Sequence, residues 1–128
     1  MAMQNNLPKN TSEYFWTRHA SFKMRQYGLS EQRVKNVIKK PKRKEEGVAK
    51  NTAAVMQPVS AKMINGEEVW KQEVWVMYQK RGTRNAQREA KGRLYAKYKI
   101  ISAWRYPGVS PKKNPIPEEI LEELGNIE

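Results

Sequence analysis

Residues 69–79 read VWKQEVWVMYQ, a stretch dominated by β-branched and aromatic side chains. Such residues fit the pleated, half-buried surface of a sheet, so this stretch predicts a β-strand. Side chains alternate along a strand, which assigns them to two faces. One face holds Trp70, Val74, Val76 and Tyr78, and the other holds Val69, Trp75 and Met77. This is the strongest strand of the predicted sheet.

Residues 95–106, YAKYKIISAWRY, predict the last strand of the sheet, and Pro107-Gly108 ends it. Alternation again gives two faces. These are Tyr98, Ile100, Ser102 and Trp104 on one side, and Lys97, Lys99, Ile101, Ala103 and Arg105 on the other. We expect this strand to pair with a neighbouring antiparallel strand.

Two upstream stretches predict the remaining strands. Residues 52–59 read TAAVMQPV, and Pro58 stands near their end, where a missing ladder donor is tolerated. Residues 42–49 are charged and suit an exposed edge strand. Asn65-Gly66 marks a turn between strands.

A pair of helices is expected before the sheet. Apolar residues recur at helical spacing in residues 18–27: Ala20, Met24 and Tyr27. Gly28 supplies the stop, and Ser30 is the N-cap of a second helix that Pro41 ends.

The ends of the chain differ in composition from its middle. Residues 1–12 are polar and predict a flexible N-terminus, and residues 107–128 combine a proline-rich linker with a short acidic helix at 118–124. Between them, residues 13–106 form one domain with a basic loop at 80–94. The expected fold is α+β, with a helical hairpin packed on one face of a three- to four-stranded antiparallel sheet.

Composition sets limits on this fold and its chemistry. The chain has 128 residues and no cysteine, so disulfides, thiolate zinc sites and a cysteine nucleophile are excluded. Leu, Ile, Val and Phe are scarce, and the tryptophans at 70, 75 and 104 are therefore expected to fill the core. No stretch reads as a membrane span or signal peptide, which favours a cytoplasmic protein without a membrane partner.

The net charge of +12 is unevenly distributed along the chain. The excess positive charge lies in residues 1–110, whereas residues 111–128 are acidic. A body this basic attracts polyanions by releasing their counterions, which makes nucleic acid the favoured partner. The expected nucleic-acid contacts are Arg81, Arg84, Arg88, Lys91, Arg93, Lys97, Lys99 and Tyr106.

Two short motifs resemble the RelE/ParE toxin superfamily, and most closely its BrnT-like branch. The first is Trp16-Thr17-Arg18-His19-Ala20 with Met24-Arg25 and Tyr27-Gly28-Leu29-Ser30. The second is Lys99-Ile100-Ile101-Ser102-Ala103-Trp104-Arg105, which is similar to the closing strand of that family. The resemblance covers residues 14–106 and implies a small endoribonuclease of a toxin–antitoxin pair, which a partner antitoxin neutralises. The enzyme it implies acts either on free RNA or on messenger RNA bound to the ribosome.

The activity that this resemblance implies is RNA cleavage without a metal or other cofactor. The 2′-hydroxyl of the RNA attacks the neighbouring phosphate, so the protein must move protons and stabilise negative charge. The resemblance implies catalytic roles for His19, which titrates near neutrality, and for Arg25 and Arg105, which can clamp a phosphate. Glu45 or Glu46 is a candidate base, and Tyr78 or Tyr106 a candidate platform for an unpaired base.

Each of these residues also has a structural interpretation. His19 can bond to the backbone or a neighbouring Glu, Arg105 can pair across the sheet, and Arg25 can be a solvated helix residue. Two other functions also stay open. One is a basic protein that binds nucleic acid without cutting it, and the other is a protein-interaction module that uses the acidic tail. The tail can also fold back over the basic face.

Overall fold

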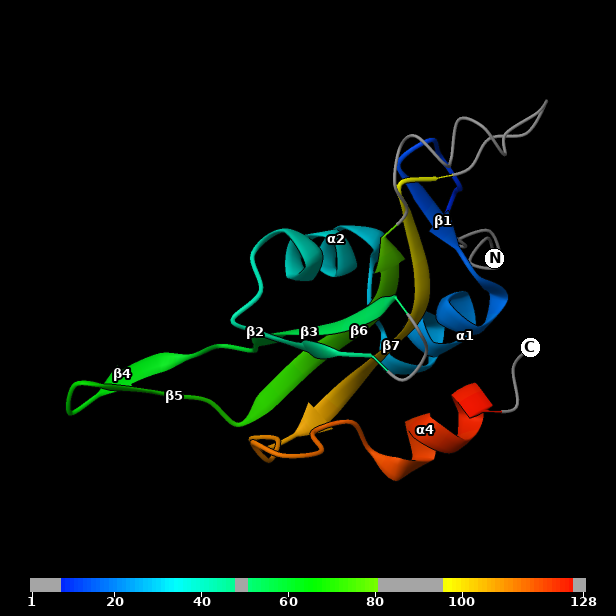
Figure 1. The fold of residues 1–128 in the computed structure, drawn as a ribbon. Helices are drawn as coiled ribbons and strands as arrows, with labels where there is room; N and C mark the ends of the chain where they lie inside the picture. Colours follow the sequence, from blue (N-terminus) through cyan, green and yellow to red (C-terminus); the bar gives the residue numbers. More distant parts are fainter. Residues whose placement is uncertain (1–7, 48–50, 81–95, 126–128) are drawn as a thin grey trace.

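The computed structural model describes residues 8–47, 51–80 and 96–125 (Figure 1). The expected flexible N-terminus at 1–12 lies only partly within these residues, and nearly all of the expected basic loop at 80–94 lies outside them. Among the described residues the elements run strand, two helices, six strands and a final helix.

Five strands form the main sheet, in the order β1-β7-β6-β3-β2. Their bounds are β1 Tyr14–Trp16, β7 Tyr98–Pro107, β6 Gln72–Lys80, β3 Thr52–Pro58 and β2 Arg43–Glu46. All neighbours are antiparallel except β1 and β7, which are parallel. The expectation of a purely antiparallel sheet of three to four strands is therefore wrong. The charged strand β2 does lie at an edge, as expected.

A second, two-stranded sheet consists of β4 Lys62–Ile64 and β5 Glu67–Val69, joined by the predicted turn. Asn65 and Gly66 both have positive φ, 52° and 81°, the geometry that the tightest hairpin turns require. The chain leaves β5 at Trp70 and bends at Lys71 before β6 begins, so the single strand expected at 69–79 is divided. Trp70 consequently packs in the second core cluster rather than with Val74, contrary to the expected alternation.

The two predicted N-terminal helices are confirmed as α1 Arg18–Tyr27 and α2 Glu31–Lys39. The Thr17 side chain caps α1 by accepting from the Ala20 N–H, and Gly28 ends it at φ 67°. The Ser30 side chain caps α2 by accepting from the Arg33 N–H. Local sequence signals thus set both ends of α1 and the start of α2.

Two apolar clusters lie on opposite faces of the main sheet. The first joins α1 and α2 to the sheet through residues such as Met24, Val37 and Val76. The second contains Trp75, Met77 and Trp104 together with Ile120 of α4, Glu118–Gly125. The expectation that helices cover a single face is therefore wrong, because α4 folds back under the sheet (Figure 1). Trp75 and Trp104 are buried as expected, with rings stacked at 5.9 Å.

A register shift in β7 changes the faces expected for its residues. Met77 of β6 pairs with Ser102 but Tyr78 pairs with Ile100, so Ile101 is an extra residue. Ile100 and Ala103 consequently both face the α1–α2 side, whereas Trp104 faces α4. Simple alternation, which grouped Ile100 with Trp104, fails at this bulge.

Candidate nucleic-acid interface

An exposed aromatic side chain lies at the β1 end of the sheet. Tyr14 and Trp16 are buried in the first cluster, so Phe15 between them points to the opposite face, on which α4 packs. Phe15 is 41% exposed. In Figure 1, β1 lies at the top and α4 at the bottom, so this end of the face is away from the helix. A ring here is accessible to a ligand.

Two polar residues continue the line of Phe15 across the sheet. Phe15 pairs with Lys99 of β7, which in turn pairs with Gln79 of β6. Neighbouring strands are about 4.8 Å apart, so these side chains lie side by side on one face. We call Phe15, Lys99 and Gln79 the Phe15 row. It combines a ring, a cation and an amide on one partly exposed surface.

Further positive charge gathers at the same end of the sheet. β6 ends at Lys80, which pairs with Tyr98, and Lys97 directly precedes Tyr98. The ammonium groups of Lys80 and Lys97 lie 5.9 and 5.6 Å from the centre of the Tyr98 ring. In the described part of the chain, neither these lysines nor Lys99 makes an ion pair with an acidic residue. Their charge is therefore available to an anionic partner.

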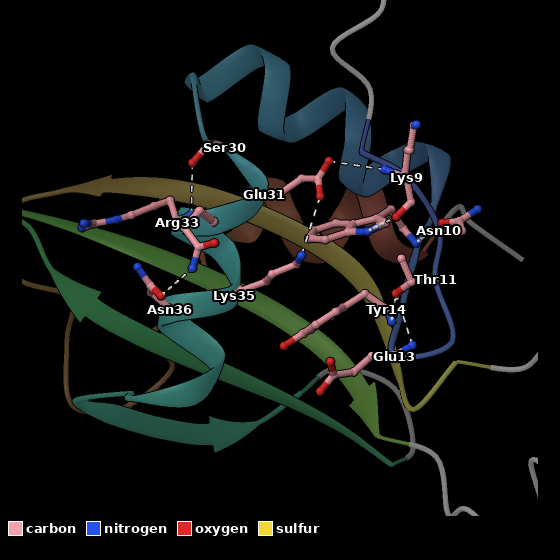
Figure 2. A network of polar contacts seen from close by, with 12 residues as sticks. Lys9, Asn10, Thr11, Glu13, Tyr14, Ser30, Glu31, Arg33, Lys35 and Asn36 are labelled. Carbon is pink, nitrogen blue, oxygen red and sulfur yellow. Dashed lines mark hydrogen bonds and ion pairs between the residues drawn. The ribbon is translucent and has the colours of Figure 1, made fainter.

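A polar network holds β1, and with it Phe15, in place (Figure 2). The Asn10 side chain accepts from the Trp16 N–H at 2.7 Å, and the Trp16 indole donates to the Lys9 carbonyl at 3.1 Å. The Lys9 N–H donates to Glu31 of α2, which also lies 3.8 Å from the Lys35 ammonium. The short strand is thus fixed to α2 as well as to β7.

The His19 side chain lies between α1 and α4 rather than beside the Phe15 row. Its Nε2 is 3.8 Å from Oε1 of Glu123, and the same carboxylate receives the buried Lys23 ammonium at 3.0 Å. Burial lowers the pKa of His19, and nearby Lys23 acts in the same direction, while Glu123 opposes them. The environment thus favours a neutral imidazole.

The two arginines expected to act with His19 lie elsewhere. Arg105 donates from Nε to the Tyr27 carbonyl at 2.7 Å and from Nη1 to the Gln72 side chain at 3.1 Å, so it caps the end of α1. Tyr27 is eight residues beyond His19, about 12 Å along a helix. Arg25 is exposed in the last turn. The structure thus places His19 and Arg105 near opposite ends of α1.

The other expected chemical groups are also dispersed. Glu45 accepts from Arg43 at 2.6 Å on the β2 edge, where Glu46 is exposed. Tyr78 is buried edge-on against Tyr98, and burial raises its pKa, so the expectation of a base-stacking role for it is wrong. Tyr106 is half-buried in the second cluster, about 23 Å along β7 from Lys99.

Of the expected nucleic-acid contacts, Lys97 and Lys99 lie together. Arg81, Arg84, Arg88, Lys91 and Arg93 lie outside the described residues. The segment that carries them connects Lys80 to Ala96, so both of its ends are attached at the β1 end of the sheet. Sequence reasoning missed Phe15, although alternation within the run Tyr14-Phe15-Trp16 predicts one ring opposite to the other two.

Glu73 is a second residue that the sequence did not single out. Its side chain is fully buried and accepts from the indoles of Trp70 and Trp75, each at 2.8 Å, and from the Ser110 N–H at 3.1 Å. Burial alone would raise its pKa, but these hydrogen bonds lower it overall. The carboxylate is saturated with donors, so it holds the fold together and is not free to act on a ligand.

The described residues hold neither a cluster of metal ligands nor a membrane-spanning helix. Within the described ranges, no three His, Cys, Asp or Glu side chains gather as metal ligands would. The helices described there are all too short or too polar to cross a membrane. Comparisons with protein-family models, curated proteins and solved structures gave no significant match. The resemblance to the RelE/ParE superfamily therefore stays a prediction.

Proposed function

We propose that this protein binds single-stranded RNA at the β1 end of its sheet. The observation that carries the proposal is the Phe15 row, in which an exposed ring stands beside a lysine without an acidic partner among the described residues. Proteins that hold single strands combine these two parts, a stacking platform and a positive track for the backbone.

Each part of the row has a defined task in this proposal. The Phe15 ring stacks on an unpaired base, and Lys99 neutralises a phosphate next to it. Gln79 has an amide, which donates and accepts hydrogen bonds and so suits a base edge or a ribose hydroxyl. Lys80 and Lys97 lie at the Tyr98 ring, which packs against the first cluster, so they add positive charge at the same end of the sheet from its opposite face.

The geometry favours single strands over duplexes. In a duplex the base faces are stacked on each other, so an exposed ring on a sheet has nothing to stack on. The choice of RNA over DNA comes from the family resemblance and from the Gln79 amide, which can bond to a 2′-hydroxyl. A DNA strand of the same sequence therefore serves as the comparison.

Strand cleavage is a separate prediction, which rests on the resemblance alone. His19, Arg25 and Arg105 lie apart on and beside α1, and His19 faces α4. Binding at the Phe15 row does not require them. RNA recovered after incubation with the protein should therefore be run on a denaturing gel. Shortened products that are absent with His19→Ala would establish a ribonuclease.

The test of binding uses the salt dependence of affinity for a labelled single-stranded RNA. For single strands each released phosphate counterion contributes roughly 0.7 to the slope of log K against log salt. Lys99→Ala should weaken binding and reduce that slope by about 0.7. Lys71→Ala is the matched control. Lys71 is exposed between β5 and β6, away from the Phe15 row, so this variant should leave the slope unchanged.

Two results would contradict this proposal. Equal slopes for Lys99→Ala and Lys71→Ala would mean that binding depends on overall charge and not on this site. Tighter binding to duplex than to single strands would remove the role given to Phe15.

A further inference from the structure

We infer that copies of this chain associate head to tail, with the β4–β5 hairpin of one copy on helix α1 of the next. The hairpin exposes three large apolar side chains to solvent. Met63, Ile64 and Val69 are 69%, 52% and 38% exposed, within two strands that pair only with each other. A two-stranded hairpin alone is marginally stable in water, so a partner surface would stabilise it.

One face of the hairpin carries the features that matter for docking. The register pairs Ile64 with Glu67 and Lys62 with Val69, so these four side chains share a face. Ile64 and Glu67 flank the turn at the tip, and Glu67 makes no ion pair with any described residue. Glu68 lies on the other face and pairs with Lys42 at 2.6 Å. The tip therefore presents an aliphatic group beside a free carboxylate.

The exposed side of α1 presents the complement. Arg18, Phe22 and Arg25 are spaced i, i+4, i+7 and form one stripe on the helix surface. Phe22 is 64% exposed, and neither arginine side chain makes an ion pair within the described ranges. An aromatic ring between two cations matches an aliphatic side chain beside an anion.

The contact has to join two molecules. In Figure 1 the hairpin projects from one side of the body and α1 lies on the opposite side, so the hairpin cannot fold onto its own helix. The carboxylate at the tip of the hairpin repels nucleic acid, so nucleic acid is a poor partner for this surface. The body of this chain is strongly basic and attracts the carboxylate. Because the two surfaces lie on opposite sides of the body, each copy offers its hairpin to one neighbour and its α1 to another, so the assembly grows head to tail.

The test is sedimentation velocity on the full chain without RNA. We expect the wild type to sediment as dimers and larger species, whose share rises with concentration in the micromolar range. Glu67→Arg places like charges together in every contact and should weaken self-association at least about tenfold, as should Arg18→Glu combined with Arg25→Glu. Glu46→Arg is the matched control, because Glu46 is exposed on β2 and should leave self-association unchanged.

Mixing the two weakened proteins gives the sharpest result. In the mixture the two proteins can alternate, which restores opposite charges in one kind of contact and keeps the wild-type pair in the other, so association should return to near wild-type affinity. This recovery would also show that both variants are folded. A monomeric wild type, or a mixture that stays monomeric, would overturn the inference, and the hairpin would then have a different occupant.

Discussion

Glu73 shows how a single residue organises this fold. Its carboxylate joins the indoles of Trp70 and Trp75 to the backbone of Ser110. The Ser110 hydroxyl in turn accepts from Arg43 at 3.1 Å, so the network also reaches the β2 edge. An isolated buried carboxylate is costly, but one with this many donors is stabilising. The bend after β5 and the start of the C-terminal segment are thereby tied to β6.

Replacing this carboxylate by an amide is predicted to destabilise the protein. In Glu73→Gln an NH₂ group faces donors, so at least one buried indole or amide N–H loses its acceptor. We expect the free energy of unfolding in urea to fall by about 2–4 kcal/mol. Glu46→Gln, at an exposed position, should change it by less than about 0.5 kcal/mol. Equal stabilities of the two variants would contradict the network.

Glu73 also predicts a dependence of stability on acid. Its pKa in the folded protein lies below the ordinary value of 4.5, so its contribution is complete above that pH and is lost as the pH falls below it. Wild type should therefore lose its advantage over Glu73→Gln as urea midpoints are measured from pH 6 down to about pH 3. A constant difference between the two proteins would argue against an ionised Glu73.

His19 gives a prediction with an unambiguous signal, because the chain contains one histidine. Its pKa, measured by NMR titration of the imidazole, should lie below 6.5, and lower still in Glu123→Gln, which removes the group that raises it. The folded protein favours the neutral imidazole. The contribution of His19 to the free energy of unfolding is therefore complete above pH 6.5 and declines below it. A pKa above 6.5 would mean that Glu123 outweighs burial.

At the scale of elements, local signals were enough for the helical hairpin and the tight turn. Ser30, Gly28 and Asn65-Gly66 act on neighbouring backbone groups, so the sequence predicted them correctly. The bulge at Ile101 and the parallel β1–β7 pair depend on contacts between distant segments, which alternation along one strand does not encode. Alternation predicts the orientation of Phe15 but not its exposure, which depends on where α4 packs, so Phe15 was missed.

The docking of α4 is testable through two adjacent residues. Ile120 is 1% exposed against the tryptophans of the second cluster, whereas Leu121 is 39% exposed. We expect Ile120→Ala to reduce the free energy of unfolding by about 2–4 kcal/mol and Leu121→Ala by less than about 1 kcal/mol. Urea unfolding followed by tryptophan fluorescence measures both. Similar small losses would mean that α4 does not pack on the sheet.

At the scale of the whole molecule, charge and shape are separated into distinct regions. The acidic helix α4 covers one end of the sheet face that carries the second cluster. Lys80, Lys97 and Lys99, which make no ion pair with any described residue, lie at the β1 end. The acidic helix therefore leaves the Phe15 row accessible while it seals the tryptophan cluster. In this account, a small protein with few aliphatic residues builds both a core and a binding surface from one sheet.

Binding of single-stranded RNA at the Phe15 row is best tested by substituting Phe15 and measuring the affinity for that RNA. Phe15→Leu keeps an apolar side chain but removes the ring, and should weaken binding about tenfold, since stacking contributes roughly 1–3 kcal/mol per base. Phe15→Trp keeps a ring and should bind within about threefold of the wild type. If Phe15→Leu binds as tightly as the wild type, the β1 end of the sheet is not the RNA site.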